Sequence, residues 1–425
     1  MTNKVQVHIE SMAFKGYGVT RVDGKVLFVP YSVAEDKAWV EIIETKRNYS
    51  IGRLSELIEP SRLRTTPPCP YFGVCGGCQW QHIVPSVHGE FKKRILTEIL
   101  KRLGGLREVP SIDVISSPQP YGYRVRVQLK VRGDTMGYYE ERSHRIVDID
   151  HCPIAHPLIN QIISSLRKAL SLFQAEEIEI NASPEEERGI LILHPLALDQ
   201  RTRDSAKEFL QSHPVLKDIA VVKEKGLISF GNPSLNFAIK FSQWREKDVL
   251  QLRTSPKSFF QVNLEQNQRL IQTVLEFSDV KKNERVLDLY AGVGNFSLPL
   301  AMASKEVLGI EENRAAVEDA RFNAGRNQIK NCTFIHGRAE DFLEHWKGEK
   351  PDLMVLDPPR TGCKTIWDQG GRLKPKKIVY VSCEPTTFSR DLRLFSAAGY
   401  SLQKLTLVDM FPQTYHMEVV GLFTH

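Results

Sequence analysis

The sequence predicts an α/β protein whose last third forms a doubly wound parallel sheet, preceded by a small β-barrel and a mixed α+β domain. From residue 251 to the end, strand-like hydrophobic runs alternate with helical patterns, which is typical of a parallel sheet covered by helices. Short β-rich runs fill residues 1–60, and strands and helices are mixed over 61–250. A chain of 425 residues is long enough for three such domains.

Residues 1–60 predict a five-stranded barrel of the oligonucleotide-binding type. The runs KVQVHIE, GVTRV, GKVLFVPY and KAWVEIIETKRN are alternating or β-rich, and Asp23-Gly24 is a hairpin signal. Basic residues of this segment are interspersed with aromatic ones: Lys15, Arg21, Lys46, Arg47 and Arg53 with Phe14, Tyr17, Phe28, Tyr31 and Tyr49. Such a face can follow phosphates and stack on bases, although a solvated barrel surface explains this segment equally well.

Composition and charge restrict the class of protein. The net charge of +6 permits a nucleic-acid partner without requiring one. The sequence starts without an apolar signal-peptide region and contains no run of 18 apolar residues, so we expect no membrane span and a cytoplasmic location. In that compartment, seven cysteines favour metal binding or catalysis over disulfides. We take a monomer as the default.

A cysteine-rich segment, CPYFGVCGGC, occupies residues 69–78. Its thiols are Cys69, Cys75 and Cys78, and Cys152 is the one further cysteine before residue 251. Three clustered ligands and one distant ligand favour an iron–sulfur cluster over structural zinc, which usually takes two close pairs. Zinc remains the alternative, and four unliganded thiols are the least favoured interpretation. The next run, GEFKKRILTEILKRLGG, predicts a helix that ends at Gly-Gly.

The stretch VLDLYAGVGNFSLPLA, residues 286–301, predicts a strand, a glycine-containing turn and a helix. Glycines allow a ligand to approach the backbone at the carboxyl end of a strand. The turn has neither the GxGxxG of dinucleotide sites nor the lysine of a P-loop. Glu311 ends the next strand, where a carboxylate can bind both ribose hydroxyls, although the helix dipole also favours an acid there. Turn and acid together favour S-adenosylmethionine.

Two further strand ends carry reactive residue types. DLMVLDPPR runs into a turn stiffened by two prolines between Asp357 and Arg360, and such a turn is suited to hold a flat base. VYVSCEP ends in Cys383, which is either a nucleophile or a small core residue. Glu418 precedes the terminal strand, where it is either a base or a solvated acid.

These motifs carry a family resemblance. FFQVN, LDLYAGVGNFSLPLA, GIEEN, DPPR, VSCEP and YHMEVV follow one another in the order found in the RNA uracil-C5 methyltransferases, which are class I, S-adenosylmethionine-dependent enzymes. Residues 1–60 resemble the TRAM domain of that family. The chain departs from the family at Glu384, where Asn usually follows the cysteine, and at Gln413, where His is frequent. The first departure concerns the hydrogen bonds of the turn and not the thiol.

The resemblance implies roles for individual residues. It makes Cys383 the nucleophile and Glu418 the base. It places Gln261, Tyr290, Glu311 and Asp357 at the cofactor, with Asn295 nearby. It strengthens the prediction of a [4Fe-4S] cluster on Cys69, Cys75, Cys78 and Cys152. Phe259 or Phe260 is expected to stack on the target base, Arg360 to contact a uracil oxygen or a phosphate, and Cys332 and Cys363 to be bystanders.

The chemistry explains why these residue types are needed. Uracil C5 is too weak a nucleophile to accept a methyl group until a thiolate adds to C6. A base must afterwards remove the C5 proton so that the enzyme can leave. The target uridine must also be flipped out or unpaired.

We therefore expect an enzyme that makes 5-methyluridine in RNA. The TRAM-like segment and the cysteines resemble the ribosomal branch, which favours 23S rRNA over tRNA. Two other interpretations stay open. An amino-group methyltransferase needs neither the thiol nor the closing Glu, and a non-catalytic RNA-binding iron–sulfur protein predicts binding without methyl transfer.

Overall fold

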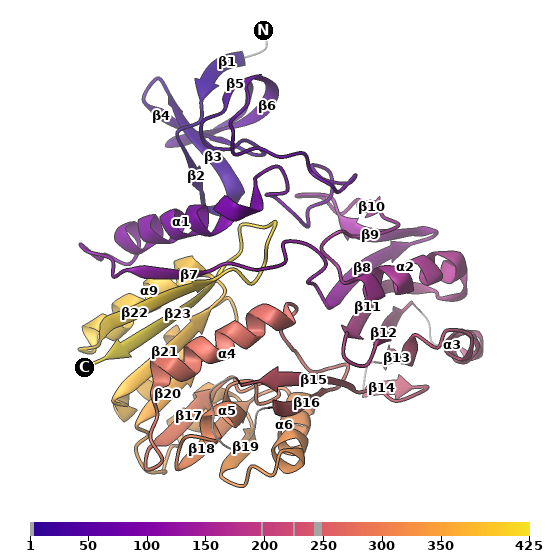
Figure 1. The fold of residues 1–425 in the computed structure, drawn as a ribbon, viewed down its shortest axis with the longest axis vertical. Helices are drawn as coiled ribbons and strands as arrows, with labels where there is room; N and C mark the ends of the chain where they lie inside the picture. Colours follow the sequence, from indigo (N-terminus) through magenta and orange to yellow (C-terminus); the bar gives the residue numbers. More distant parts are fainter. Residues whose placement is uncertain (1–3, 197–198, 224–225, 242–248) are drawn as a thin grey trace.

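The computed structural model describes residues 4–196, 199–223, 226–241 and 249–425. Three sheets and a two-stranded ribbon build the molecule. The barrel lies at one end, an eight-stranded sheet lies at the other, and the central domain lies beside them (Figure 1). The eight-stranded sheet, which carries the predicted catalytic residues, is called the catalytic sheet below. Within the described residues, no helix has the length and apolarity needed to cross a membrane.

The N-terminal barrel has six strands in the order β1-β5-β6-β4-β3-β2, one more than the five predicted. The additional strand is the short β2, which pairs with β3. The elements are β1 (Lys4–His8), β2 (Ser11–Ala13), η1 (Phe14–Gly16), β3 (Tyr17–Val22), β4 (Lys25–Val29), β5 (Lys37–Thr45) and β6 (Tyr49–Glu59). Asp23 and Gly24 form the tight β3–β4 turn with positive φ angles of 49° and 75°, as the hairpin signal predicts.

The cysteine segment leads from the barrel into η2 (Pro85–Val87) and helix α1 (His88–Arg102). The predicted helix is therefore present. Helix α1 lies between the barrel and the catalytic sheet (Figure 1), where its apolar side packs on α9 and β7. Strand β7 (Ile112–Ile115) then joins the edge of the catalytic sheet by pairing in parallel with β22.

The central domain is a seven-stranded sheet in the order β10-β9-β8-β11-β12-β13-β14. Its helices α2 and α3 cover one face, where Ile159, Ile163 and Phe209 pack on the strands. The elements are β8 (Arg126–Arg132), β9 (Thr135–Tyr139), β10 (Ile146–Asp148), α2 (Pro157–Ala169), η3 (Leu170–Leu172), β11 (Ala175–Ser183), β12 (Arg188–Pro195), α3 (Gln200–Ser212), β13 (Leu216–Lys223) and β14 (Gly226–Ser229). A ribbon of β15 (Leu235–Lys240) and β16 (Val249–Thr254) follows.

The catalytic sheet has the order β19-β18-β17-β20-β21-β23-β22-β7. Strands β17 to β21 are parallel, and β23 is antiparallel to both of its neighbours. The strands are β17 (Arg285–Leu289), β18 (Glu306–Glu311), β19 (Cys332–His336), β20 (Leu353–Leu356), β21 (Lys377–Ser382), β22 (Ser401–Val408) and β23 (Glu418–Thr424). This is the predicted doubly wound architecture.

Helices cover both faces of this sheet. One face carries α4 (Leu264–Ser278), α5 (Ser297–Ala301) and α6 (Arg314–Arg326). The other carries α7 (Ala339–Glu344), α8 (Lys364–Gly370), η4 (Gly371–Leu373) and α9 (Pro385–Ala397), together with α1. Because the strands are buried on both faces, their sequences are nearly continuous apolar runs, as in β20 and β21.

Candidate active site

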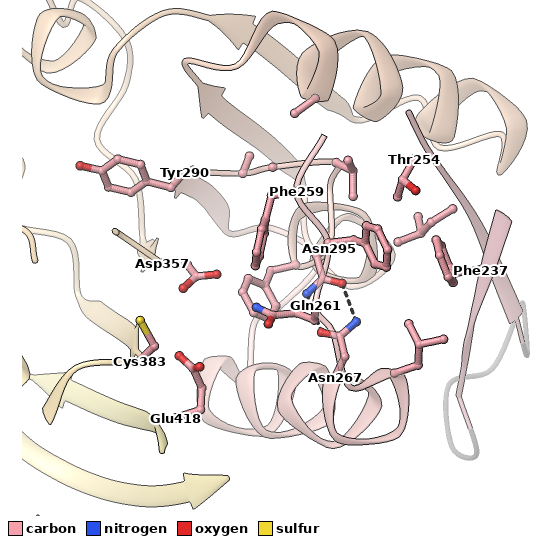
Figure 2. A pocket seen from close by; sticks show the side chains of 18 of the residues that line it. Phe237, Thr254, Phe259, Gln261, Asn267, Tyr290, Asn295, Asp357, Cys383 and Glu418 are labelled. Carbon is pink, nitrogen blue, oxygen red and sulfur yellow. Dashed lines mark hydrogen bonds between the residues drawn. The ribbon is translucent and has the colours of Figure 1, made fainter. Parts of the chain in front are cut away.

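A cavity of about 560 Å³ opens at the carboxyl ends of the parallel strands. Its wall includes the seven residues predicted to be catalytic or to contact the cofactor: Gln261, Tyr290, Asn295, Glu311, Asp357, Cys383 and Glu418. Figure 2 shows Cys383, Asp357 and Glu418 together at one end, and Thr254 and Phe237 at the other. One end of the cavity therefore carries the polar reactive groups, and the other is largely apolar.

The glycine turn after β17 brings backbone to the cavity. Tyr290, Gly292 and Gly294 have φ angles of 68°, 54° and 91°, a conformation that favours glycine. A Cβ added at Gly292 would meet no atom within 4 Å. Since Gly292 lines the cavity, this open space lies where a ligand can approach the backbone closely.

Glu311 ends β18, where the predicted ribose-binding acid is expected. One carboxylate oxygen accepts a hydrogen bond from the amide of Gly292 at 2.9 Å, and the other accepts one from the amide of Asn313 at 2.7 Å. Both amides hold the carboxylate at the cavity wall. The second lone pairs of the two oxygens are available for the hydroxyls of a ribose.

Two carboxyl groups of the cavity wall, those of Glu311 and Asp357, interact with a third, that of Asp288, which lies outside the wall. Burial, reinforced by the charge of Glu311, raises the pKa of Asp288 to about 7. Burial and the charges of Asp288 and Glu311 raise the pKa of Asp357 to about 7 as well. One oxygen of Asp288 has no hydrogen-bond partner within the described part of the chain. A positively charged ligand such as a sulfonium would relieve this mutual repulsion, so the carboxyl groups fit S-adenosylmethionine.

Cys383 lies at the end of β21, in the turn before α9. Glu384 is the N-cap of α9, and its carboxylate accepts hydrogen bonds from the amide and the hydroxyl of Thr386 at 3.3 and 2.7 Å. Pro385 occupies the first helical position, where a missing N–H costs nothing. Glu384 thus caps the helix as an Asn would, and its departure from the family pattern leaves the turn intact.

Burial and neighbouring carboxylates raise the pKa values of Cys383 and Glu418, and the charge of Arg360 lowers them. Burial raises the pKa of the Cys383 thiol to about 12, helped by the charges of Glu418 and Asp357, while Arg360 acts in the other direction through its charge and a hydrogen bond. Burial also raises the pKa of Glu418 well above its ordinary value, and the charge of Asp357 adds to this effect. In the free protein the thiol is therefore protonated at neutral pH.

Phe259 and Phe260, the two rings considered for stacking on the target base, differ in exposure. Phe259 is 60% exposed and lines the cavity, whereas Phe260 is 7% exposed and packs on Phe237 with ring centroids 4.7 Å apart. Phe259 is thus the more exposed of the two rings, and the guanidinium of Arg126 lies 5.8 Å from its centroid. Asn295 lines the cavity, but its amide exchanges two hydrogen bonds of 2.9 Å with Asn267 (Figure 2).

A second cavity of about 560 Å³ adjoins the first. The two share Phe259, Arg360, Phe411 and His416 as wall residues. The second is also lined by Arg124 and Arg126 of the central domain, and by four cysteines: Cys69, Cys75, Cys78 and Cys152. The predicted metal ligands therefore lie next to the candidate catalytic site.

The four thiols are close enough to influence one another. Burial raises the pKa of Cys75 to about 11 and that of Cys78 to about 12, and the charges of neighbouring cysteines contribute in each case. Asn160 fixes the Cys152 turn by accepting from its amide at 2.8 Å and donating to its carbonyl at 3.0 Å. Among the residues that the structure describes, however, no group of three or more side chains is arranged to hold a single metal ion.

Three of the five aromatic residues named for the barrel form a row, whereas Phe14 packs on Tyr415 and Tyr31 on Phe72. Tyr17, Phe28 and Tyr49 follow one another with ring centroids 6.4 and 5.6 Å apart. Tyr49 is exposed and the other two rings are half-buried. The five basic residues named for this segment are exposed. The barrel thus presents the combination of rings and cations that single-stranded nucleic acids bind.

Some wall residues escaped sequence reasoning. Asn267 lies on α4, and no motif marks it; its spacing of four from Asn263 is the one signal that would have placed it on the same helix face. Phe411 lies in the loop before β23, where it contributes to both cavities. Cys332 and Cys363 lie outside both cavity walls, as expected of bystanders.

Comparisons with known proteins identify the family. A family model described as tRNA (uracil-5-)-methyltransferase matches residues 88–425, and a TRAM domain model matches residues 3–55. An RNA methyltransferase of Aquifex aeolicus that is described as uncharacterized is 34% identical over 425 residues, with 98% of each chain covered. The 23S rRNA (uracil(1939)-C(5))-methyltransferase RlmD of Pectobacterium atrosepticum is 35% identical over 430 residues, which cover 99% of this chain and 93% of that protein.

A solved structure extends the similarity to the whole fold. The tRNA (uracil-54, C5)-methyltransferase of Pyrococcus abyssi, crystallised with S-adenosyl-L-homocysteine, superposes with a TM-score of 0.76. It is 25% identical in sequence, and the match covers 99% of this chain and all of that one.

Proposed function

The chain belongs to the family of S-adenosylmethionine-dependent RNA uracil-C5 methyltransferases, and from this premise we propose that it methylates a uridine of 23S rRNA, with Cys383 as nucleophile and Glu418 as base. One observation carries the proposal: Cys383, Asp357 and Glu418 face one another in a cavity that also contains the predicted cofactor residues (Figure 2). The full-length similarity to a 23S rRNA methyltransferase supports the choice of RNA.

The first half of the proposed reaction forms two bonds. The thiolate of Cys383 adds to uracil C6, and the electrons of the C5–C6 double bond shift into an enolate. When bound, S-adenosylmethionine would supply an electrophilic methyl group to C5 of the enolate, and the electron pair of the broken S–CH3 bond would stay on the sulfur as the neutral thioether leaves. Arg360, which lies against Cys383 and is exposed at the cavity rim, favours the thiolate and the negative charge that follows it.

The second half restores the base. The carboxylate of Glu418 takes the proton from C5, and the C5–H electron pair forms the new C5–C6 double bond. The C6–S bond breaks, and its electron pair leaves on Cys383. The burial of Glu418, which is 3% exposed, makes its carboxylate a stronger base than a solvated one. Asp357 and Glu311 hold the cofactor, and Phe259 stacks on the flipped uracil.

Covalent trapping tests this assignment. The protein, purified without oxygen, is mixed with S-adenosylmethionine and 5-fluorouridine-substituted 23S rRNA or tRNA. Fluorine cannot leave as a proton, so we expect an adduct with 23S rRNA that survives a denaturing gel and is lost in Cys383→Ala. An adduct with tRNA instead would identify tRNA as the substrate. Methyl transfer without any adduct would favour an amino-group methyltransferase.

We further propose that Cys69, Cys75, Cys78 and Cys152 hold a [4Fe-4S] cluster. Three clustered thiols and one distant thiol favour a cluster over a zinc ion, which usually takes two close pairs. A four-iron cluster takes one thiolate on each iron, so its ligands stand further apart. Cys78 is buried and the other three cysteines are half-buried, and all four line one cavity beside the central domain, which suits such a group. When bound, it crosslinks the linker and the central domain, and methylation needs no redox step from it.

Metal analysis tests the cluster. We expect iron and acid-labile sulfide in equal amounts in the protein purified without oxygen, and loss of both in Cys78→Ser. One zinc per chain and no sulfide would replace the cluster by a zinc site. Cys332→Ser is the matched control, because Cys332 lies outside the cavity walls.

A further inference from the structure

The loop between β22 and β23, residues 409–417, leads directly into Glu418. Its side chains Phe411 and His416 line both cavities. Five consecutive carbonyl groups of this loop, from Asp409 to Gln413, accept hydrogen bonds from outside the loop. So continuous a set of contacts fixes the backbone path between β22 and Glu418, which is more than ordinary loop packing requires.

The donors come from four different parts of the chain. Helix α4 and its N-cap supply Gln266 to the carbonyl of residue 409 at 3.0 Å and Asn263 to that of residue 410 at 3.2 Å. Lys92 of α1 donates to the carbonyl of residue 411 at 3.2 Å, and the hydroxyl of Tyr123 donates to that of residue 412 at 3.0 Å. The amides of residues 79 and 80, which follow Cys78, both donate to the carbonyl of residue 413 at 3.0 Å.

Lys92 is the one charged donor of this set. Its side chain is fully buried, and its ammonium binds the carboxylate of Asp409 at 2.6 Å. Its second acceptor, the carbonyl of Phe411, also accepts from the amide and hydroxyl of Thr414, and that hydroxyl accepts from the amide of His416 at 3.2 Å. Lys92 is thereby connected through two residues to a wall of the catalytic cavity.

A buried ion pair of this kind is a poor way to gain stability. Removing two charges from water costs about as much as their attraction returns, and apolar pairs of similar shape are often as stable. The pair fixes the geometry of the loop instead. The ammonium of Lys92 holds the first residue of the loop, Asp409, and orients its third carbonyl, that of Phe411. The contact on Phe411, which no apolar residue can replace, indicates the same purpose.

We propose that Lys92 is a positioning residue for proton removal: by holding Asp409 and the carbonyl of Phe411, it fixes the 409–417 loop so that Glu418 faces C5 of the methylated uracil. This inference rests on the proposed role of Glu418. The C5 proton passes to the Glu418 carboxylate, its bonding electrons form the C5–C6 double bond, and Cys383 leaves as thiolate. Misplacement of Glu418 slows this step, and addition of Cys383 and transfer of the methyl group are left unaffected.

The test separates the two halves of the reaction. Lys92→Met/Asp409→Leu replaces the ion pair by apolar side chains of similar shape and removes the donor to Phe411. RNA that carries tritium at uridine C5 reports proton removal, and a labelled cofactor methyl reports transfer in a single turnover. We expect the rate of methyl transfer to stay within about twofold of that of the unchanged protein. The rate of tritium release should be at least tenfold lower, and a tenfold change corresponds to about 1.4 kcal/mol in the barrier. A methylated protein–RNA adduct then survives a denaturing gel.

Three further variants decide the outcome. Glu418→Gln tests the proposed function itself: if it shows no such split, the role of Glu418 is wrong, independently of Lys92. Lys217→Met breaks a shielded ion pair with Glu186 in the central domain, and transfer and release should stay equal there. Tyr123→Phe removes only the donor to the carbonyl of Pro412. It replaces the double variant in the test if the double variant does not fold. Tritium release should then also be slower than methyl transfer, by a smaller factor. Equal slowing of transfer and release in both loop variants would make Lys92 merely structural and overturn the inference.

Discussion

At the residue scale, the proposed reaction requires Cys383 to lose a proton before it adds to uracil C6. Burial and the nearby carboxylates hold its pKa at about 12 in the free protein, and the thiolate is the nucleophile. A sulfonium bound in the same cavity would add a positive charge, which would lower this pKa. In the proposed reaction, cofactor binding would therefore favour the thiolate as well as supply the methyl group.

This argument predicts the pH dependence of adduct formation. Below the pKa of a thiol, the thiolate fraction rises about tenfold for each pH unit. We expect the initial rate of adduct formation with 5-fluorouridine RNA, measured at low cofactor concentration, to rise from pH 6.5 to pH 8.5. A rate that is flat over this range would mean that Cys383 is already a thiolate before the cofactor binds.

Glu384 gives a second prediction at this scale. It caps α9 through the amide of Thr386, and loss of an N-cap costs about 1 kcal/mol. We expect Glu384→Ala to lower the free energy of unfolding by about 1 kcal/mol and to slow adduct formation, because Cys383 lies in the same turn. Glu384→Asn should retain both, since Asn caps equally well. A loss of activity in Glu384→Asn would show that the carboxylate has a role beyond the cap.

At the element scale, the segment from the cysteines to α1 contains two buried neutral histidines. Burial lowers the pKa of His82 to about 4 and that of His88 to about 4, whereas an unfolded chain holds histidine near 6.5. The unfolded state therefore binds more protons between pH 6.5 and 4. The stability that these residues contribute is fully present above pH 6.5 and is lost as the pH falls toward 4.

Acid unfolding measures this contribution. Each histidine accounts for at most about 3 kcal/mol of the decrease in unfolding free energy over this interval. We expect His82→Gln/His88→Gln to have a flatter pH dependence in chemical denaturation between pH 6.5 and 4. His144→Gln is the control, because His144 is exposed. An unchanged slope in the double variant would place the acid sensitivity elsewhere.

The same scale shows what sequence could and could not predict. Strand β20, strand β21 and the glycine turn were predictable because their residues are adjacent in sequence and strand periodicity is a local signal. The reciprocal pair of Asn267 and Asn295 depends on α4 lying against the turn after β17. The pairing of Lys92 with Asp409 joins residues far apart in the chain. Such contacts follow from tertiary packing, which periodicity does not encode.

At the scale of the whole molecule, the proposed function requires the barrel and the candidate catalytic cavity to act on one RNA. Five exposed basic residues and a row of aromatic rings lie on the barrel. Each phosphate contact that a single strand gives up reduces the slope of log affinity against log salt by about 0.7. If RNA follows this face of the barrel, the barrel should contribute most to affinity at low salt and little to the choice of uridine.

Salt titration tests the contribution of the barrel. We expect Lys15→Gln/Arg21→Gln/Arg47→Gln to reduce the salt slope of RNA binding by about 2, with the affinity loss greatest at low salt. The methyl-transfer rate at saturating RNA should stay unchanged, because these residues lie outside the cavity wall. A slope equal to that of the unchanged protein would mean that RNA does not follow this face of the barrel.

The sequence pattern predicts three domains, and one strand of the structure lies across a predicted boundary. Residues 112–115 fall in the stretch assigned to the central domain, and they form β7 at the edge of the catalytic sheet. A four-residue run is too short for a sequence pattern to reveal its partner strand. The parallel pairing with β22 had to come from the structure.

That pairing has a consequence for how the protein is made. Strand β7 is synthesised early, whereas β22, its only partner in the described sheet, is close to the last part of the chain to be translated. Until then β7 has no neighbour and the barrel can already fold, so the nascent chain carries an unpaired strand through most of its translation. Parallel contacts at such long sequence separation form slowly. The edge of the sheet is thus completed late, when a strand translated early pairs with one translated near the end of synthesis.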